Sequence, residues 1–297
     1  MKIGLIDVDG HNFPNLALMK ISAWHKSKGD TVEWCFPLDH YDIVYQSKVF
    51  DETYSPDIEW TPIADKIIKG GTGYGLDNKL PDEIEHIYPD YSIYPELTKD
   101  TAYGFLTRGC PRGCKFCIVA GKEGRRSIKV ADLSEFWRGQ KNIELLDPNL
   151  LACKERLELL DQLIESKAIV NFNQGLDIRL TNEEIADKLG QIRVKRLHFA
   201  WDNPNDDLVP YFKKFSEAYR RKSSSTKVVY VLTNFNSTMN ENLYRVYTLR
   251  DLGYDPYVMV YDKPNAPREI KDLQRWVNNR FIFRSCEKFE DYKNGGN

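Results

Sequence analysis

The feature that most constrains the fold is a regular recurrence of short apolar segments, each separated from the next by a stretch with helical spacing. From about residue 101 onward these segments predict strands at 103–106, 142–146, 169–172, 196–200, 227–232 and 257–261. The stretches between them, such as 152–166 and 183–189, have lengths suited to helices that cross over between parallel strands. A parallel sheet or partial barrel is therefore the most economical topology.

A second pattern precedes this one. Short β-branched runs alternate with one amphipathic stretch closed by Gly29, and they predict strands at 2–6, 31–34, 42–46 and 67–71 and a helix at 15–28. Gly, Pro, Asp and Tyr then recur without a clear period. The sequence thus predicts a small Rossmann-like α/β domain at 1–75, a linker at 76–100 and a larger core domain with a C-terminal extension at 101–297.

Composition narrows the class of protein. A chain of 297 residues can bury about three quarters of its unfolded surface without staples. The formal net charge of -2 gives no global signature of nucleic-acid or anionic-membrane binding. The start of the chain has an apolar run interrupted by Asp7 and Asp9, unlike a signal peptide, and no run approaches membrane-spanning length. We therefore expect a cytoplasmic protein with no membrane partner, in which clustered cysteines are metal ligands rather than disulfides.

Three of the six cysteines lie in one short stretch directly after the first core strand. Cys110, Cys114 and Cys117 have the spacing C-x3-C-x2-C, and the glycines at 109 and 113 permit a tightly curved loop. No fourth cysteine or histidine follows nearby, so a tetrahedral zinc site is incomplete locally. An iron–sulfur cluster with one open iron fits better. A zinc site completed by a distant cysteine, Cys153 or Cys286, stays an alternative.

This loop, with the aromatic Phe116 directly before its last cysteine, resembles that of the radical S-adenosylmethionine (SAM) superfamily. The resemblance covers roughly residues 100 to 265. It implies a TIM-like partial (β/α)6 barrel and a [4Fe–4S] cluster held by the three cysteines, with SAM on the fourth iron. Reduction by a protein such as flavodoxin or ferredoxin would cleave SAM to methionine and a 5′-deoxyadenosyl radical, which abstracts hydrogen from a substrate.

Further site residues are implied by the same resemblance. Leu146-Asp147-Pro148-Asn149 stands where the family often has a Gly-Gly-Glu run that binds the methionyl amine of SAM, so Asp147 is a candidate partner for that ammonium. A plain turn formed by Asp147 and Asn149 is the alternative. The predicted cofactor-binding set is Phe116, Asp147, Gln174, Arg179, Asp202, Thr233 and Asn234.

Most of these residues follow the ends of predicted strands, where hydroxyl, amide and carboxylate groups suit the ribose and carboxylate of SAM. Arg179 could grip a carboxylate of SAM or substrate, whereas a surface ion pair is the common fate of such an arginine. His198, inside the fourth core strand, is a further candidate contact to SAM or substrate.

The N-terminal segment resembles a cobalamin-binding-type domain that precedes the radical domain in one branch of the superfamily. The resemblance is carried by the proline-containing loop 7–15 before a helix and by Lys69-Gly70-Gly71 closing a strand. The Asp-x-His-x-x-Gly signature of that domain is absent, and the segment is too short for five strands. We therefore predict a truncated, degenerate domain that does not bind cobalamin and acts as a lid, substrate platform or interface.

The sequence thus predicts a radical SAM enzyme with one cluster and an unidentified substrate, which is a small molecule, a peptide or a nucleic acid. A non-catalytic iron–sulfur or zinc module, acting as a redox sensor or with a nucleic-acid or protein partner, is the alternative. Between residues 108 and 129, seven Lys or Arg residues face a single acid, Glu123. These charges either attract phosphates or simply solvate the loop and offset the cluster's thiolates.

Overall fold

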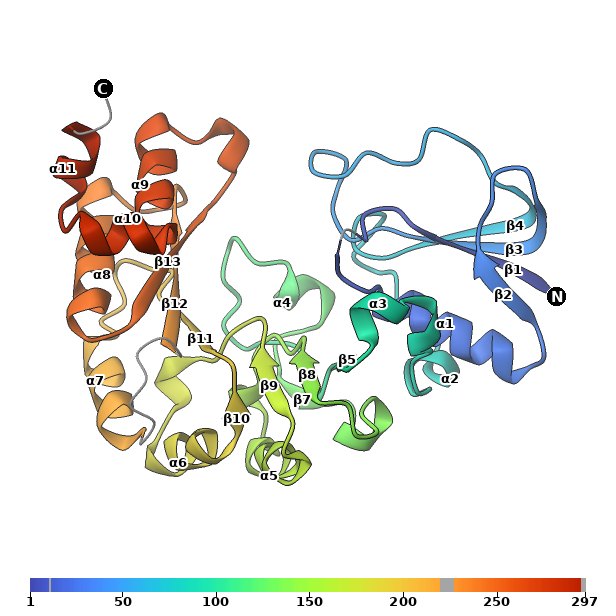
Figure 1. Ribbon diagram of the computed structural model, residues 1–297, viewed down its shortest axis with the longest axis horizontal. Coiled ribbons are helices and arrows are strands. Elements are labelled where there is room, and N and C mark those ends of the chain that lie inside the picture. The colour runs from blue at the N-terminus through green and yellow to red at the C-terminus, as the bar shows by residue number, and fades with distance from the viewer. Residues whose placement is uncertain (11, 220–226, 295–297) are drawn as a thin grey trace.

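The computed structural model describes residues 1–10, 12–219 and 227–294 of the chain (Figure 1). Its N-terminal part is a parallel sheet in the order β2-β1-β3-β4, built from β1 (Lys2–Asp7), β2 (Thr31–Trp34), β3 (His40–Ser47) and β4 (Ile63–Gly70). Helix α1 (Leu16–Ser27) packs Leu18 and Ile21 against Ile3 and Leu5 of β1. The predicted strands and helix are confirmed here, although β4 begins four residues earlier than expected, at residue 63 rather than 67.

The segment predicted as a linker is packed against both of its neighbours. It contains α2 (Asp82–Glu85), the 3-10 turn η1 (Tyr91–Ile93) and α3 (Pro95–Thr98). Asp90 accepts a hydrogen bond from Ser22 of α1 at 2.6 Å, and the hydroxyl of Tyr91 donates to the carbonyl of Phe136 in the core at 2.6 Å. These contacts join the N-terminal sheet to the core, and the domain boundaries themselves stay a prediction.

Two further parallel sheets form the core of the described chain. The first has the order β10-β9-β8-β5, and the second has the order β11-β12-β13. Their strands are β5 (Thr101–Gly104), β8 (Asn142–Leu145), β9 (Ile169–Phe172), β10 (Arg193–Val194), β11 (Leu197–Ala200), β12 (Lys227–Thr233) and β13 (Asp255–Val260). One isolated parallel bridge, from Leu176 to Phe199, links the two sheets.

The prediction of parallel α/β sheets is confirmed, whereas their arrangement as a partial (β/α)6 barrel stays a prediction. The described strands follow one another in chain order without closing, and the ladder is interrupted between β10 and β11. The strand predicted at 103–106 is wrong by two residues. β5 ends at Gly104, and beyond it the amide of Leu106 donates to the side chain of Asp147 instead of to a neighbouring strand. Gly104 itself packs against the ring of Phe136, where a Cβ would lie 2.3 Å from the ring.

Four crossover helices, α5 to α8, and three helices that follow the last strand, α9 to α11, pack against the core sheets and one another. They are α5 (Arg156–Ser166), α6 (Glu183–Gln191), α7 (Val209–Ala218), α8 (Met239–Asp251), α9 (Arg268–Asn278), α10 (Arg280–Ser285) and α11 (Phe289–Asn294). Short 3-10 turns complete the connections: η2 (Leu133–Glu135), η3 (Leu150–Ala152), η4 (Ile178–Leu180) and η6 (Lys263–Asn265). Alternate strand residues such as Ile143 and Val170 join helix residues in one buried cluster. Among the described residues, every helix is too short or too polar to span a bilayer.

A buried arginine holds the carboxyl ends of β11 and β12. Arg245 of α8 is wholly buried and donates to the carbonyls of Trp201 at 2.6 Å and Leu232 at 2.9 Å. It also donates to the side chain of Asn242 at 2.6 Å. Burial lowers the pKa of Arg245 to about 10, although the nearby carboxylate of Asp202 opposes the shift. The buried guanidinium therefore depends on carbonyl and amide oxygens that come together only when α8 packs on the ends of β11 and β12.

We expect Arg245→Met to lower the free energy of unfolding by about 3 kcal/mol, because it leaves several buried acceptors without a donor. Arg250→Met is the matched control on the same helix, since Arg250 donates to the carbonyl of Glu287 at an exposed site. Its loss should be about 1 kcal/mol or less. Urea unfolding followed by circular dichroism measures both, and equal losses in the two variants would contradict the role given to Arg245.

Candidate functional site

The three clustered cysteines lie on one loop at the carboxyl end of the first core strand. The loop is closed at its base by the antiparallel pair β6 (Thr107–Arg108) and β7 (Ile128–Lys129), and it contains the single turn of α4 (Val119–Lys122). Gly109 adopts a φ of 86°, and a Cβ there would lie 2.0 Å from the carbonyl oxygen of Arg126. Only glycine allows the two ends of the loop to approach so closely.

The thiols themselves are accessible. Cys110 and Cys114 are half-buried, Cys117 is exposed, and all three are free. Burial raises the pKa of Cys114, and the neighbouring Asp202, Cys117 and Cys110 raise it further. The three thiols therefore lie within electrostatic range of one another. In the described part of the chain, however, no three His, Cys, Asp or Glu side chains are drawn together tightly enough to hold a metal ion.

The carboxylate of Asp147 ties the end of β8 to the base of this loop. It accepts hydrogen bonds from the backbone N–H of Thr107 at 2.5 Å and of Leu106 at 3.2 Å, and from the hydroxyl of Thr107 at 2.7 Å. Burial raises the pKa of Asp147 to about 6, although these hydrogen bonds oppose the rise. Its contact to a SAM ammonium stays a prediction, while the observed contacts position the loop.

Asn149, which the sequence suggested only as a turn residue, reaches the cysteine loop directly. The side-chain amide of Asn149 donates to the sulfur of Cys110 at 3.5 Å, and its backbone carbonyl accepts from the hydroxyl of Ser127 at 2.8 Å. Its buried Oδ1 accepts no hydrogen bond from any described residue. The signal available in the sequence was its place just after a strand end, which it shares with Asp147.

A network of opposite charges fixes the loop on its other side. Asp177 is almost buried and accepts from Arg112 of the loop at 2.5 Å and from Arg179 at 2.8 Å. Arg179 also contacts Asp206 at 2.7 Å. Burial acts to raise the pKa of Asp177, but the two arginines outweigh it and hold that pKa below its usual value. Arg179 thus forms the ion pair weighed as its alternative, and through Asp177 it anchors the cysteine loop.

Two other predicted residues lie beside the loop. Asp202 follows β11, and burial raises its pKa to about 6 against the opposing charges of Arg245 and Arg179. Asp202 is also close enough to Cys114 to affect the pKa of that thiol. Phe116 packs edge to face on Phe235, with ring centroids 5.5 Å apart, so the loop reaches the end of β12. These contacts bring the cysteine loop, which follows β5, to residues that follow β11 and β12.

The structure leaves the remaining candidates outside this group. The hydroxyl of Thr233 donates to the carbonyl of Met259 at 3.2 Å, and the side-chain amide of Asn234 donates to the carbonyl of Tyr261 at 2.8 Å. Both hydrogen bonds join the end of β12 to the end of β13. Gln174 is exposed and makes no hydrogen bond with another described residue. Their cofactor contacts stay predictions. His198 lies on β11, where Nδ1 is 3.3 Å from the carbonyl oxygen of Phe172.

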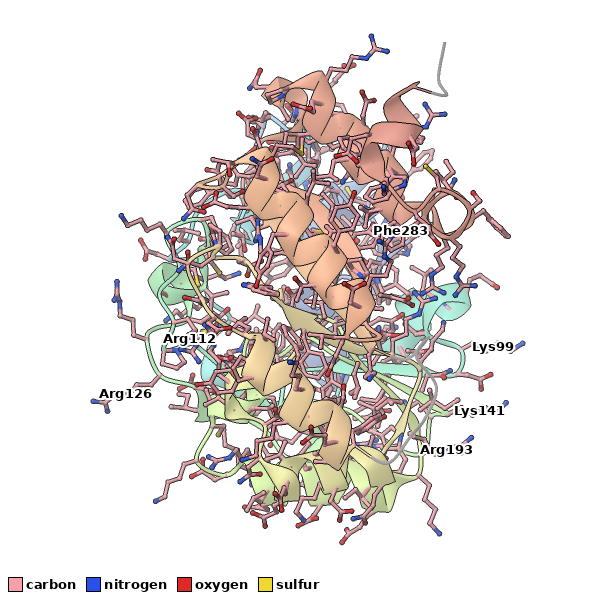
Figure 2. All side chains as sticks on the ribbon, turned by 90° about the vertical axis from the view of Figure 1, so that its left-hand side faces the viewer. Lys99, Arg112, Arg126, Lys141, Arg193 and Phe283 are labelled. Atoms are coloured by element: carbon pink, nitrogen blue, oxygen red, sulfur yellow. The ribbon has the colours of Figure 1, made fainter. Side chains whose placement is uncertain are left out.

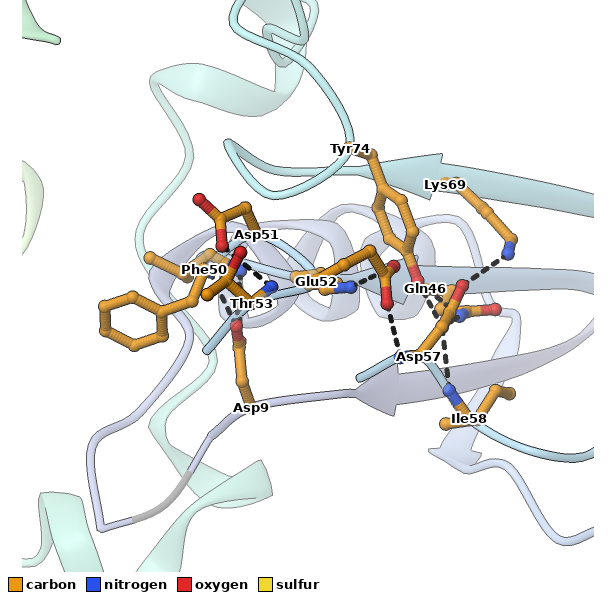
Figure 3. A network of polar contacts seen from close by, with 12 residues as sticks. Asp9, Gln46, Phe50, Asp51, Glu52, Thr53, Asp57, Ile58, Lys69 and Tyr74 are labelled. Carbon is orange, nitrogen blue, oxygen red and sulfur yellow. Dashed lines mark hydrogen bonds and ion pairs between the residues drawn. The ribbon is translucent and has the colours of Figure 1, made fainter. Parts of the chain in front are cut away.

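The carboxyl edge of the N-terminal sheet contacts the cysteine loop and is filled by its own residues. Lys122 of α4 donates to the hydroxyl of Thr72. Figure 3 shows the carboxylate of Asp9 accepting from the backbone N–H groups of Val49 at 2.9 Å and Phe50 at 2.7 Å. Glu52, labelled in the same view, forms an ion pair with the fully buried Lys48.

Close backbone packing seals this edge further. A Cβ at Gly73 would lie 2.2 Å from the carbonyl oxygen of Phe50, and one at Gly71 would lie 2.3 Å from that of Lys48. The turn after β4 therefore packs directly on the chain leaving β3. The described residues of the edge thus bond to one another, while the expectation that this domain does not bind cobalamin stays a prediction. His11 lies outside the described residues.

Comparison with known proteins gives a likeness of fold alone. No family model matches the chain, and no curated protein matches its sequence. Its fold is similar to that of TsrM, a radical SAM methyltransferase from Kitasatospora setae, with cobalamin and a [4Fe–4S] cluster bound; the TM-score is 0.62 at 10% identity over 87% of this chain and 74% of that one. A second TsrM structure, with tryptophan substrate and the SAM analogue aza-SAM, gives 0.63 at 11% identity over 87% and 72%.

The raised pKa of Asp147 makes a pH-dependent contribution to stability. The group titrates near 3.8 when exposed and at about 6 in the folded chain, so the folded state binds the proton more tightly. Stability is therefore lost as the pH rises between these values, by up to about 3 kcal/mol for the wild type relative to Asp147→Asn. Urea unfolding at pH 4 and pH 7 measures this difference. Parallel profiles for the two proteins would contradict it, and Asp187→Asn, at an exposed helix position, serves as the control.

Proposed function

We propose that this protein is a radical SAM enzyme that binds a [4Fe–4S] cluster through Cys110, Cys114 and Cys117 and modifies a substrate not yet identified. The observation that carries the proposal is the placement of three free thiols on one glycine-shaped loop at the carboxyl end of a parallel core. Active sites of α/β folds collect at that end of their strands. The fold shared with a radical SAM methyltransferase supports it.

The chain's own residues would hold and shape the cluster site. When bound, the cluster supplies the electron that cleaves SAM. Asp147 and the Arg112–Asp177–Arg179 network hold the loop from two sides, and Asn149 donates toward the sulfur of Cys110. Hydrogen bonds to a ligating sulfur tune the potential of such clusters. These contacts would keep the base of the loop in place while the three thiols converge on the cluster.

Other parts of the proposal concern SAM and the N-terminal sheet. We assign contacts with SAM to Phe116, Asp202 and the free Oδ1 of Asn149, which surround the loop. The two core sheets would act together as an open partial barrel. Residues 1–75 would form a platform beside it that does not take up cobalamin, a proposal supported by the filled carboxyl edge.

The zinc alternative finds no support in the surroundings of the other cysteines. The thiol of Cys153 is buried and donates to Glu155 at 3.1 Å, and that of Cys286 donates to the carbonyl of Lys288 at 3.2 Å. Neither thiol is directed at the loop. A fourth protein ligand, which a structural zinc site requires, is therefore not supplied by them.

The first test is anaerobic reconstitution with iron and sulfide, followed by dithionite and SAM and chromatography for 5′-deoxyadenosine. We expect formation of 5′-deoxyadenosine by the native chain and a loss of at least about 100-fold in Cys114→Ala, because one cluster ligand is removed. Cys153→Ala and Cys286→Ala are the matched controls and should keep the activity. A colourless protein with one bound zinc, or a stable cluster that never cleaves SAM, would sink the proposal.

The electron donor would dock on the exposed face of the cysteine loop. Lys115, Arg125 and Arg126 are exposed and form no ion pair with any described residue, and Figure 2 shows Arg126 projecting away from the molecule. The apolar side chains of Ile118 and Ile128 on the same loop are 51% and 54% exposed. Unpaired cations around an apolar patch suit an acidic redox protein such as flavodoxin or ferredoxin.

Reversal of these three charges separates docking from catalysis. Replacing Lys115, Arg125 and Arg126 together by Glu should lower the flavodoxin-dependent rate at low salt by about tenfold or more, since electrostatic steering is lost. The rate with dithionite should stay within about twofold. A triple reversal of Lys99, Lys141 and Arg193, which lie on the other side of the molecule in Figure 2, is the control. Equal effects of both triple variants would refute the assigned surface.

A further inference from the structure

The core sheets have a second face, opposite the helices, that is neither apolar nor sealed. Alternation along the strands places Tyr103, Glu144 and Asn171 in one row, because Tyr103 pairs with Glu144 and Glu144 with Asn171 in the parallel register. The residues beside them in sequence, such as Ile143 and Val170, point into the helix-covered core. Glu144 and Asn171 are only half-buried, so this row borders accessible space on the uncovered face.

A carboxylate lies at the centre of the row without a cationic partner. Glu144 accepts a hydrogen bond from the amide of Asn171 at 2.7 Å, and that amide also donates to Asn173 at 2.8 Å. Burial raises the pKa of Glu144, opposed by Asn171 and by the charge of Lys195. Within the described residues, no Lys, Arg or His comes within ion-pair distance of this carboxylate. A half-buried carboxylate in this position favours a ligand that brings a cation or N–H donors.

Aromatic rings continue the row across the second sheet. His198 lies next to β9, and its ring stacks on Tyr230 with centroids 5.3 Å apart and planes 7° from parallel. Tyr230 in turn meets Tyr257 edge to face at 5.9 Å, and Tyr257 is 41% exposed. Burial lowers the pKa of His198, so this histidine is a neutral stacking surface at neutral pH. Planar rings and cations are the groups that such aromatic faces attract.

We call the six residues of this row the inner band: Tyr103, Glu144, Asn171, His198, Tyr230 and Tyr257. The inner band crosses both core sheets just before the strand ends that lead to the cysteine loop, to Asp147 and to Asp202. A ligand bound on the inner band would therefore lie next to the strand ends that carry the proposed radical site.

We propose that the inner band binds the substrate, and that the group it recognises is a planar aromatic or heteroaromatic ring carrying a cationic or amidine-like nitrogen. The ring packs on Tyr230 and Tyr257, and the nitrogen donates to Glu144. That the bound ligand is the substrate rests on the proposed function. That a ligand of this chemical class binds to the inner band does not rest on it. An anionic ligand of the same shape is disfavoured by the carboxylate.

The test is calorimetric titration of the full chain, with no reductant, using three probes. Benzamidine has the ring and the cation, benzoate has the ring with an anion, and cyclohexanecarboxamidine has the cation without the aromatic ring. We expect benzamidine to bind at one site, at least about tenfold more tightly than either comparator. Glu144→Gln should weaken benzamidine about tenfold and leave benzoate unweakened, and Tyr257→Leu should weaken benzamidine with little effect on cyclohexanecarboxamidine.

Controls keep the outcome interpretable. Glu184→Gln and Tyr244→Leu, at exposed positions on α6 and α8, should bind benzamidine as the native chain does. Tyr257 is exposed, so Tyr257→Leu carries the test if Glu144→Gln does not fold. Equal affinities for the three probes, or benzamidine binding unchanged in both inner-band variants, overturn the proposal. Formation of 5′-deoxyadenosine is measured separately, so a chain that binds benzamidine and never cleaves SAM fails the proposed function alone.

Discussion

The site depends on one buried carboxylate. Asp147 leaves the end of β8 and accepts three hydrogen bonds from Leu106 and Thr107, at the point where the chain turns from β5 into the cysteine loop. The loop has no regular structure of its own beyond a single helical turn, so its position is set by what holds its base. Burial of a carboxylate costs free energy unless N–H and O–H groups compensate it. The same bonds that offset this cost fix where the three thiols stand.

Much of the fold could be predicted because apolar periodicity directly reports which strands are buried. The strand at 169–172, with two of its alternating residues buried, lies where the sequence placed it. The first core strand was displaced because the amides of Leu106 and Thr107 donate to the side chain of Asp147 instead of to a neighbouring strand, a contact between residues far apart in the chain. The packing of residues 76–100 against their neighbours was not predicted for a similar reason. Its contacts, such as that of Ser22 with Asp90, are isolated polar pairs that leave no periodic signal in the sequence.

The candidate site was predictable only where its chemistry is written in consecutive residues. Cysteine spacing revealed the loop, but nothing local distinguishes Asn149, which reaches Cys110, from an ordinary turn asparagine. Arg179 was singled out as a cofactor contact, which stays a prediction, and its observed partners, Asp177 and Asp206, belong to a charge network that also includes Arg112 of the loop. Such networks form between strand ends that the sequence separates by tens of residues, so only the fold can pair them.

The carboxylates of Asp9, at the carboxyl edge of the N-terminal sheet, and of Glu144, on the inner band of the core sheets, have different kinds of partner. In the N-terminal sheet, Asp9 accepts from backbone N–H groups of the chain that follows β3, and the turn after β4 packs on that chain. Across the core sheets, Glu144 accepts from the amide of Asn171 and, among the described residues, has no cation within ion-pair distance, and the adjacent rings are stacked on one another with area left exposed. Since buried charge tends to be neutralised from within a fold wherever nothing else binds, an unneutralised carboxylate beside open aromatic faces indicates that its partner comes from outside the chain.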